Sequence, residues 1–539
     1  MSDWKEKAQA KKASVDALLP PEWKLPQDVI DQFNETTPVS VIGIHEQYMS
    51  DYEIEITEVE SGTKLIEHIA NKKYSAVDVV SAFLHRAAIA NQLTNCCTEY
   101  MFDYGLQRAK YLDEFLQKNG HTIGPLHGLP ITLKDSFNVP GFDSTLGYIS
   151  FIGNKDNIPE SKLCKILHDL GAVFYVKTNL PTTTMAAETE NNIFGRTLNP
   201  LNLTWSPGGS SGGEGSLIKQ RGSLLGIGTD IGGSVRIPAL CCGIYGFRPS
   251  ADRIPYGDKS LPFDENYLLF KSVAGPLATN IDDIILFTQS VLNAKPWLYD
   301  HSALPFTYQK IDPIPSKLTI GVIVDDETLP VHPPIQDIIN QAATKLEAAG
   351  HKIVYIKDHP KYGVAYKASA AQFGITDHID GVKSGLDYIE DGKEPVVNCL
   401  KNCIYEAEPL DTVTKIYLNR KIQDETSVGW YKVFDENGLD VLLSPGNCSS
   451  APLHDTYGIS PYTEMWNFVD FPACVIPFGI VDKEYPDDSH RYPSWLEGIY
   501  AKYHPKNYLG GIGSVQLTLP RLQDERLLAI AKVIDLDLK

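Results

Sequence analysis

Two glycine-rich turns, each presenting a serine, are the part of the sequence in which residue types and spacing most favour chemistry. The first reads Ser-Pro-Gly-Gly-Ser-Ser-Gly-Gly-Glu-Gly over residues 206–215, and the second reads Gly-Thr-Asp-Ile-Gly-Gly-Ser-Val-Arg-Ile-Pro over residues 228–238. Glycine adopts positive φ and lets backbone N–H groups approach a ligand. This composition is also typical of surface turns. The apolar flanks nevertheless predict that both turns, with Ser210 and Ser234, are buried, where such turns usually bind a ligand.

A lysine at the end of an apolar segment is the third candidate for chemistry. Residues 128–135 read Gly-Leu-Pro-Ile-Thr-Leu-Lys-Asp, and residues 131–133 predict a short buried strand that Lys134 ends. Lysine is seldom buried without a partner, because the loss of water disfavours its charged form. The local sequence alone therefore favours a surface ion pair between Lys134 and Asp135.

Composition and charge exclude several classes of partner. The chain has 539 residues and a net charge of −20, which argues against nucleic acid as a partner. Its nine cysteines are odd in number and include two pairs of sequence neighbours, so a reducing compartment is the simpler interpretation. No apolar run reaches the roughly 18 residues of a membrane span, and residues 1–24 lack the apolar core of a signal peptide. We expect a cytoplasmic protein with no membrane partner.

No metal and no cofactor are expected from the sequence. The fourteen histidines are dispersed, and no set of histidines, cysteines or carboxylates has the spacing of a metal site. We therefore expect full activity after exhaustive treatment with a chelator. Activity that is lost to the chelator and restored by zinc or magnesium would contradict this expectation.

Helical segments alternate with short strands along the chain. Helices are expected at residues 161–170 and 334–349, followed by strands at 172–177 and 352–355. This alternation predicts an α/β fold with a largely parallel sheet. Residues 1–60 are polar and punctuated by proline, and we expect them to form a helical extension packed on the body, which comprises residues 61–539.

Together, the segment at 128–135 and the two serine turns resemble the amidase signature family. Residues 86–95, Arg-Ala-Ala-Ile-Ala-Asn-Gln-Leu-Thr-Asn, are most similar to the fungal acetamidase and general amidase branch. The resemblance implies a single large α/β domain whose mixed, mostly parallel central sheet is covered by helices on both faces.

The resemblance also implies roles for particular residues and changes the interpretation of Lys134. It implies a Ser-Ser-Lys triad in which Ser234 is the nucleophile, Ser210 bridges the two other residues, and Lys134 is the base, with a pKa lowered by desolvation. The peptide bond at Ser210 is cis in the family. The other implied residues are the oxyanion donors Ile231, Gly232, Gly233 and Ser234, the supporting residues Ser211, Asp230 and Arg236, and the substrate-pocket residues Thr184 and Met185.

The function implied by the resemblance is that of an amidase. It would hydrolyse small carboxylic acid amides to carboxylate and ammonia through an acyl-enzyme, with a small-molecule amide as its partner and a homodimer as a compatible assembly. A fatty-acid amide hydrolase and the amidase subunit of a tRNA-dependent amidotransferase are alternatives. The lack of a membrane-anchoring segment favours small amides, and the presence of all three triad residues disfavours a non-catalytic binding protein.

Overall fold

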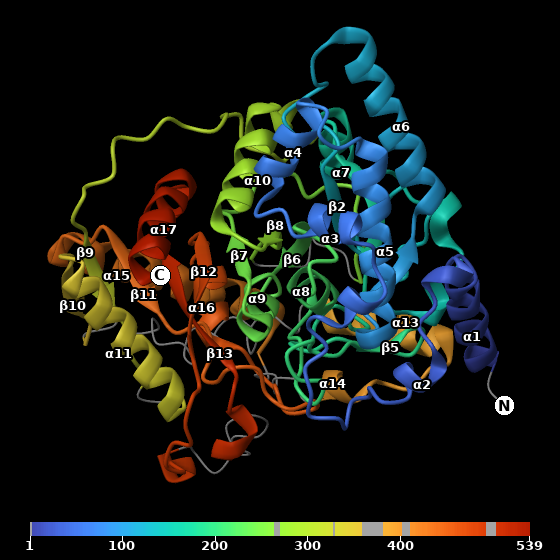
Figure 1. Cartoon of the computed structure of the whole chain (residues 1–539). Coiled ribbons are helices and arrows are strands. Elements are labelled where there is room, and N and C mark those ends of the chain that lie inside the picture. The colour runs from blue at the N-terminus through green and yellow to red at the C-terminus, as the bar shows by residue number, and fades with distance from the viewer. Residues whose placement is uncertain are drawn as a thin grey trace.

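Strand β2 (Pro130–Lys134), which ends in the candidate lysine, lies within an eleven-stranded sheet (Figure 1). The computed structural model describes residues 3–262, 270–326, 329–357, 360, 381–401, 410–491 and 503–539, and the statements below concern these residues. The other strands of the sheet are β1 (Cys97–Tyr100), β3 (Val173–Thr178), β6 (Leu225–Asp230), β7 (Tyr245–Arg248), β8 (Val273–Ala278), β9 (Thr319–Val322), β10 (Lys352–Tyr355), β11 (Val441–Ser444), β12 (Ala473–Ile480) and β13 (Ile512–Thr518). A separate small sheet pairs β4 (Glu190–Asn191) with β5 (Gly195–Arg196).

The sheet is mixed, and its strand order is β1-β3-β2-β6-β8-β7-β12-β13-β11-β9-β10. Parallel pairing joins β3, β2 and β6 in one block and β11, β9 and β10 in another. The pairings from β6 through β8, β7, β12 and β13 to β11 are all antiparallel, as is that of β1 with β3. The single α/β domain with a mixed sheet is confirmed, and its parallel pairing is confined to the two blocks in which strands alternate with helices.

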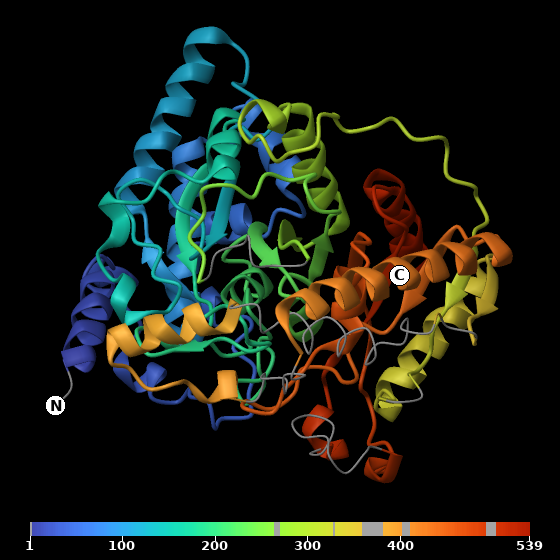
Figure 2. The ribbon, with the colours of Figure 1, turned by 180° about the vertical axis from the view of Figure 1, so that it is seen from behind.

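Helices cover both faces of this sheet (Figures 1 and 2). On one face α8 (Gly212–Lys219) packs on β2, β6 and β8, and α9 (Arg236–Cys242) packs on β7 and β12. On the other face α10 (Ile281–Asn293) packs on β8, and α17 (Asp524–Leu538) packs on β12 and contacts both α10 and α11 (Pro333–Ala348). The remaining α-helices are α1 (Asp3–Asp16), α2 (Gln27–Ile30), α3 (Asp51–Thr57), α4 (Gly62–Ala70), α5 (Ala76–Thr94), α6 (Phe102–Asn119), α7 (Lys162–Asp169), α13 (Gly381–Gly392), α14 (Asn398–Lys401), α15 (Thr412–Asn437) and α16 (Pro461–Phe468).

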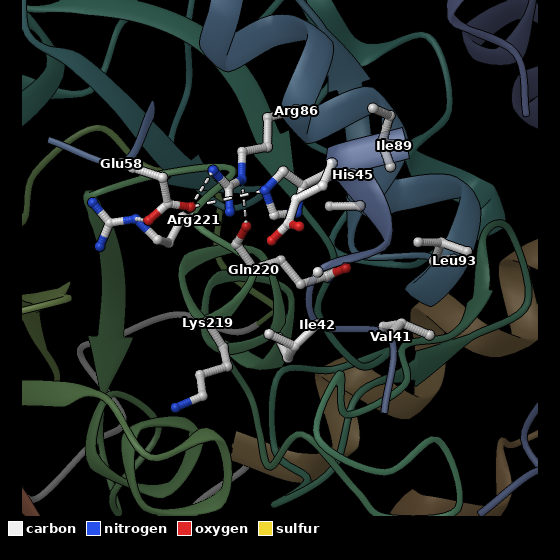
Figure 3. Close-up of a pocket in the computed structure, with 13 residues that line it drawn as sticks. Val41, Ile42, His45, Glu58, Arg86, Ile89, Leu93, Lys219, Gln220 and Arg221 are labelled. Atoms are coloured by element: carbon white, nitrogen blue, oxygen red, sulfur yellow. Dashed lines mark hydrogen bonds and ion pairs between the residues drawn. The ribbon is translucent and has the colours of Figure 1, made fainter. Parts of the chain in front are cut away.

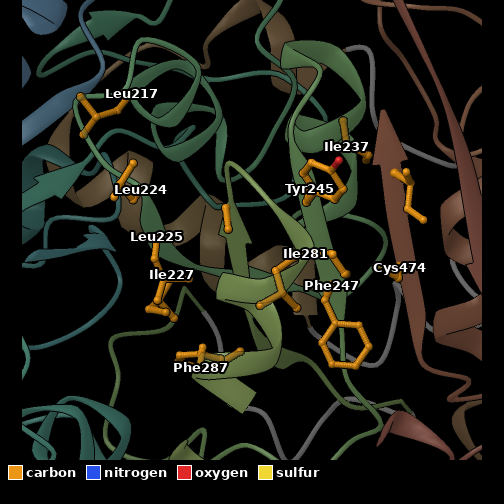
Figure 4. Packing of buried hydrophobic residues seen from close by; sticks show 14 of the residues in the cluster. Leu217, Leu224, Leu225, Ile227, Ile237, Tyr245, Phe247, Ile281, Phe287 and Cys474 are labelled. Atoms are coloured by element: carbon orange, nitrogen blue, oxygen red, sulfur yellow. The ribbon is translucent and has the colours of Figure 1, made fainter. Parts of the chain in front are cut away.

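The alternation of side chains along β6 explains how both helical layers approach the sheet. Successive residues of a strand face opposite sides, and Leu225 and Ile227 lie in the main core with Phe287 of α10 (Figure 4). Gly226 and Gly228 face α8 instead, and a Cβ at Gly226 would overlap the carboxyl group of Glu214. The Leu-Gly-Ile-Gly sequence thus gives the strand one bulky face for the core and one bare face for a closely packed helix.

Helix α5 begins at a capping box. Ser75 is the N-cap, and its side chain accepts from the N–H of Asp78 while the Asp78 carboxylate accepts from the N–H of Ser75. This reciprocal capping box satisfies two backbone donors that the first turn leaves unpaired. The predicted helices at 161–170 and 334–349 correspond to α7 and α11, and the strands that follow them to β3 and β10.

The described residues before 60 lie against the body of the protein. Val15 and Leu19 enter the main core, and residues 41–58 enclose a cavity with α5 and the end of α8 (Figure 3). In that cavity the Glu58 carboxylate lies 2.6 Å from Arg86 Nη1 and 2.9 Å from Arg221 Nε. These three charged side chains of the cavity wall therefore pair with one another. A domain boundary at residue 60 stays a prediction. None of the described helices combines the length and the apolar character that crossing a bilayer requires.

Candidate active site

Lys134 lies at the carboxyl end of β2 and is fully buried. Its Nζ lies 2.6 Å from Ser210 Oγ and 2.7 Å from Thr229 Oγ1. Thr229 and Asp230 end β6, the parallel neighbour of β2, and the carboxyl ends of parallel strands meet at one edge of a sheet. The topology therefore brings the lysine and both polar residues of β6 to the same place.

The surface pair between Lys134 and Asp135 that local sequence favoured is wrong. Asp135 is also buried, and its carboxylate accepts from Thr98 Oγ1 at 2.8 Å and from the Leu146 N–H at 2.9 Å. It also lies 3.7 Å from the Nζ of Lys177. The partners of the Asp135 carboxylate are therefore Thr98, Leu146 and Lys177, and none of them is the Lys134 amine.

Burial lowers the pKa of Lys134 to about 7. The negative charge of Asp230 opposes this shift, as does that of Glu214 whenever Glu214 is ionised, and Lys259 adds to the shift. Near neutrality a substantial share of the amine is uncharged and carries a lone pair. An amine in this state can accept a proton, which the ordinary ammonium of a surface lysine cannot do.

The first serine turn holds Ser210 beneath this amine. The peptide bond between Gly209 and Ser210 is cis, and Ser210 lies two residues before α8 begins. The N–H of Ser211 donates to the carbonyl of Ser234 at 3.2 Å, which ties the two serine turns together. The Ser211 hydroxyl accepts from the N–H of Thr229 at 3.3 Å, so Ser211 also fixes the residue that contacts Lys134.

The second serine turn leaves the Ser234 hydroxyl without a hydrogen-bond partner among the described residues, and Ser234 is 8% exposed. The two serine side chains are therefore adjacent in the fold but not hydrogen-bonded to each other. Gly233 has a φ of +131°, and a Cβ there would overlap Thr463 Oγ1, so only glycine fits. The Thr463 hydroxyl in turn donates to the carbonyl of Gly232 at 2.7 Å and fixes the turn from outside.

Asp230 and Arg236 form a fully buried ion pair under this turn. The Asp230 carboxylate accepts from Arg236 Nε at 3.0 Å and from Asn467 Nδ2 at 2.8 Å. Burial opposes ionisation of Asp230, but the charge and hydrogen bonds of Arg236 and the bond from Asn467 outweigh it and lower the pKa of Asp230 to about 2. Arg236 also donates to Gln516 Oε1 at 2.8 Å, which anchors the turn to β13.

The backbone N–H groups of the turn differ in what they bind. The N–H of Gly233 donates to Asp230 Oδ1 at 2.9 Å and is therefore engaged. The N–H groups of Gly232 and Ser234 have no partner within the described part of the chain. Ile231 precedes them at the mouth of the turn, and its predicted part in anion binding stays a prediction.

Thr184 and Met185 lie in a separate loop and are half-buried. The N–H of Thr184 donates to the carbonyl of Pro181, and Met185 packs against an apolar cluster that includes Tyr148 and Ile389. Neither residue is hydrogen-bonded to Lys134, Ser210 or Ser234. Their predicted place in the substrate pocket stays a prediction.

Sequence reasoning missed two residues of the site. Thr229 lies inside the quoted 228–238 motif, and its contact with Lys134 could have been expected from the parallel pairing of the two strands. Glu214 lies inside the 206–215 motif. It is completely buried, whereas an acidic residue in the first turn of a helix is usually exposed. In both cases the signal was a polar residue inside an otherwise apolar or glycine-rich stretch.

Comparison with known proteins gives consistent matches over nearly the whole chain. A family model described as Amidase matches residues 78–528. An amidase from Gibberella moniliformis is 37% identical over 99% of this chain and 98% of its own length. An acetamidase from Emericella nidulans is 36% identical over 98% of this chain and 97% of its own length.

A solved structure of a fatty acid amide hydrolase is similar over the full length. It superposes with a TM-score of 0.89 at 32% identity and covers 100% of this chain and 96% of that chain.

Proposed function

The chain belongs to the amidase family, and we propose that it hydrolyses small carboxylic acid amides to a carboxylate and ammonia. The observation that carries this proposal is the buried Lys134 amine, which lies 2.6 Å from Ser210 Oγ in the turn that adjoins Ser234. An amine that is partly uncharged and lies next to two serines can take the proton of a serine hydroxyl and so activate it as a nucleophile.

In the proposed reaction Ser234 Oγ attacks the amide carbonyl carbon. Its proton passes to Ser210 as Ser210 gives its own proton to the Lys134 amine, and a tetrahedral intermediate forms. The C–N bond then breaks as the proton returns through Ser210 to the nitrogen, which leaves as ammonia. Water attacks the resulting ester on Ser234 by the same proton path and releases the carboxylate.

The developing oxyanion needs donors that are not already engaged. The N–H groups of Gly232 and Ser234 meet this condition, and we propose them as the main donors, with Ile231 beside them. Gly233 acts differently: its N–H binds Asp230, which shapes the turn that presents the other donors. Asp230 and Arg236 therefore support the anion site through the backbone, without contacting the substrate.

Thr229 orients the base in this proposal. An uncharged amine has two N–H donors and one lone pair, so donation to Thr229 Oγ1 at 2.7 Å leaves the lone pair available to Ser210. We expect Thr229→Val to lower kcat by about tenfold, because one hydrogen bond in a buried site contributes roughly 1–3 kcal/mol. Thr229→Ser keeps the acceptor and is the matched control. Equal kcat in the valine variant and the wild type would contradict this role.

The length of the acyl chain separates the two leading substrate classes. The acetamidase similarity favours small amides, whereas the full-length similarity to a fatty acid amide hydrolase favours long-chain ones. The test is ammonia release by the purified chain across a matched panel of aliphatic, aromatic and long-chain amides. Highest kcat/KM on short aliphatic amides supports the proposal, and highest kcat/KM on long-chain amides replaces it with the alternative.

The same experiment addresses the amidotransferase alternative. A subunit that functions only within a tRNA-dependent complex releases no ammonia from simple amides on its own. Turnover of acetamide by the isolated chain, without ATP or tRNA, is the expected result. No turnover of any amide in the panel would contradict the proposed function.

A further inference from the structure

Glu214 is a fully buried carboxyl group close to the candidate base. It lies in the first turn of α8 and faces the sheet. Its Oε2 lies 2.6 Å from Thr132 Oγ1 on β2, and its Oε1 lies 2.9 Å from Thr178 Oγ1 on β3. Both hydrogen-bond partners are uncharged hydroxyl groups, so no contacting cation offsets the cost of burying a carboxylate here.

The hydroxyl protons around Glu214 can be assigned by counting. Thr132 Oγ1 lies 3.0 Å from Ser223 Oγ, which lies 2.9 Å from the carbonyl oxygen of Leu225. Each hydroxyl has one proton, and a carbonyl only accepts, so Ser223 donates to Leu225 and Thr132 donates to Ser223. The remaining contact, between Thr132 and Glu214, then needs a proton from Glu214. The hydroxyls of Thr132, Thr178 and Ser223 supply three protons for these four contacts, so all four are hydrogen bonds only when the carboxyl group supplies the fourth proton.

The surrounding charges agree with this assignment. Burial raises the pKa of Glu214 to about 8, although Thr132, Thr178 and Lys134 oppose the shift. The other titratable groups facing this region are Cys97 on β1 and Tyr175 on β3, and burial raises the pKa of both well above neutrality. Asp230 acts on Lys134 from β6, where Arg236 balances its charge.

Glu214 also connects the elements that carry the two proton-transfer groups. Thr132 lies two residues before Lys134 on the same face of β2, and Ser210 lies just before α8. The bonds from Glu214 to β2 and β3 therefore set how far α8, and with it Ser210, stands from the Lys134 amine. Gly226 leaves the space that the carboxyl group occupies.

We propose that Glu214 is a positioning residue that stays a carboxylic acid in the working enzyme and holds the Ser210 turn against the strand carrying Lys134. This inference rests on the proposed function of Lys134 as the base. An ionised carboxylate here would favour the ammonium form of Lys134 and raise the pH at which the amine can act as the base. A carboxylic acid supplies the same tie between helix and sheet without that charge.

Infrared difference spectroscopy tests the protonation state directly. The spectrum of the wild type minus that of Glu214→Gln is recorded near neutral pH. The expected result is a C=O stretching band of a protonated carboxylic acid that the variant lacks. A difference spectrum with only carboxylate bands would overturn the inference, whatever the role of Lys134.

The pH profile of kcat tests the consequence for the base. Glu214→Gln keeps both bonds to the threonines, and we expect its kcat to rise with pH at the wild-type midpoint and to exceed that of Glu214→Leu by roughly tenfold or more. If Glu214 were ionised in the wild type, its removal would lower the midpoint by about one pH unit or more, and this would overturn the inference. Equal kcat for the two variants would contradict the positioning role.

These outcomes are distinguishable from failure of the proposed function. If Lys134 is not the base, Lys134→Ala keeps its activity and the pH profile has another origin, whatever the infrared band shows. If Lys134 is the base and Glu214 is ionised, Lys134→Ala loses most of its kcat while the infrared band is absent. Glu214→Gln is nearly isosteric with the wild type, so a failure of the leucine variant to fold leaves the spectroscopic test intact.

Discussion

Ser234→Ala is expected to abolish amide turnover while leaving the fold intact. Removal of the nucleophile from a serine hydrolase lowers kcat by about 10⁴-fold or more, because no other group forms the acyl-enzyme. The Ser234 hydroxyl makes no hydrogen bond to the described residues, so its loss leaves no buried polar group unpaired. The thermal midpoint of unfolding should therefore match that of the wild type.

Ser211→Ala is the matched control for this substitution. Ser211 belongs to the neighbouring turn and binds the backbone of Thr229, so we expect a decrease in kcat of about tenfold. Comparable kcat losses in the two variants, or measurable turnover by Ser234→Ala above the uncatalysed rate, would contradict the assignment of Ser234.

Lys134→Ala is expected to lower kcat by roughly 10²–10⁴-fold, the usual contribution of a general base. Lys134→Arg should be no better, because the guanidinium stays protonated and cannot accept a proton. In the wild type the amine must be uncharged to act, and its pKa is about 7, so kcat should rise with pH through a midpoint near this value. An active arginine variant with the wild-type pH profile would contradict the proposed base.

The burial of Lys134 should lower the free energy of unfolding at neutral pH. Its pKa is 10.5 in the unfolded chain and about 7 when folded, so between these values the unfolded chain binds more protons and stability rises with pH. We expect Lys134→Met to be inactive but more resistant to thermal unfolding at pH 7, with the gain shrinking as the pH approaches 10. A gain that does not depend on pH would contradict the burial of a titrating amine.

The sequence motifs contain the residues of the candidate site, but the local pattern around Lys134 predicted a surface position for a residue that is buried. Lys134 and Asp135 look like a surface pair because lysine is seldom buried without a partner and Asp135 is its neighbour in the sequence. Their burial depends on β3, β6 and α8, which come from distant parts of the chain and cover both sides of the strand. The resemblance to a family corrected the interpretation of Lys134, whereas its contact with Thr229 required the strand pairing.

The fold was predictable where helices and strands alternate, as at α7 and β3. The middle of the sheet was not predictable, because helices do not alternate with β8, β12 and β13 in the same way. The antiparallel pairing in this part also joins distant segments, and β7 and β12 lie more than 200 residues apart in the chain. The support of the serine turn shows the same limit. Asn467 and Gln516 lie 231 and 280 residues after Arg236 in the chain, and only the packing of α16 and β13 brings them to it.

The central claim is that Ser234 is the nucleophile, and covalent labelling tests it most directly. The wild-type protein is treated with a fluorophosphonate, digested, and examined by peptide mass spectrometry. The account predicts one modified peptide, with the label on Ser234, and no labelling of Ser234→Ala under the same conditions. A label on Ser210, Ser211 or any other serine, with Ser234 unmodified, would contradict it.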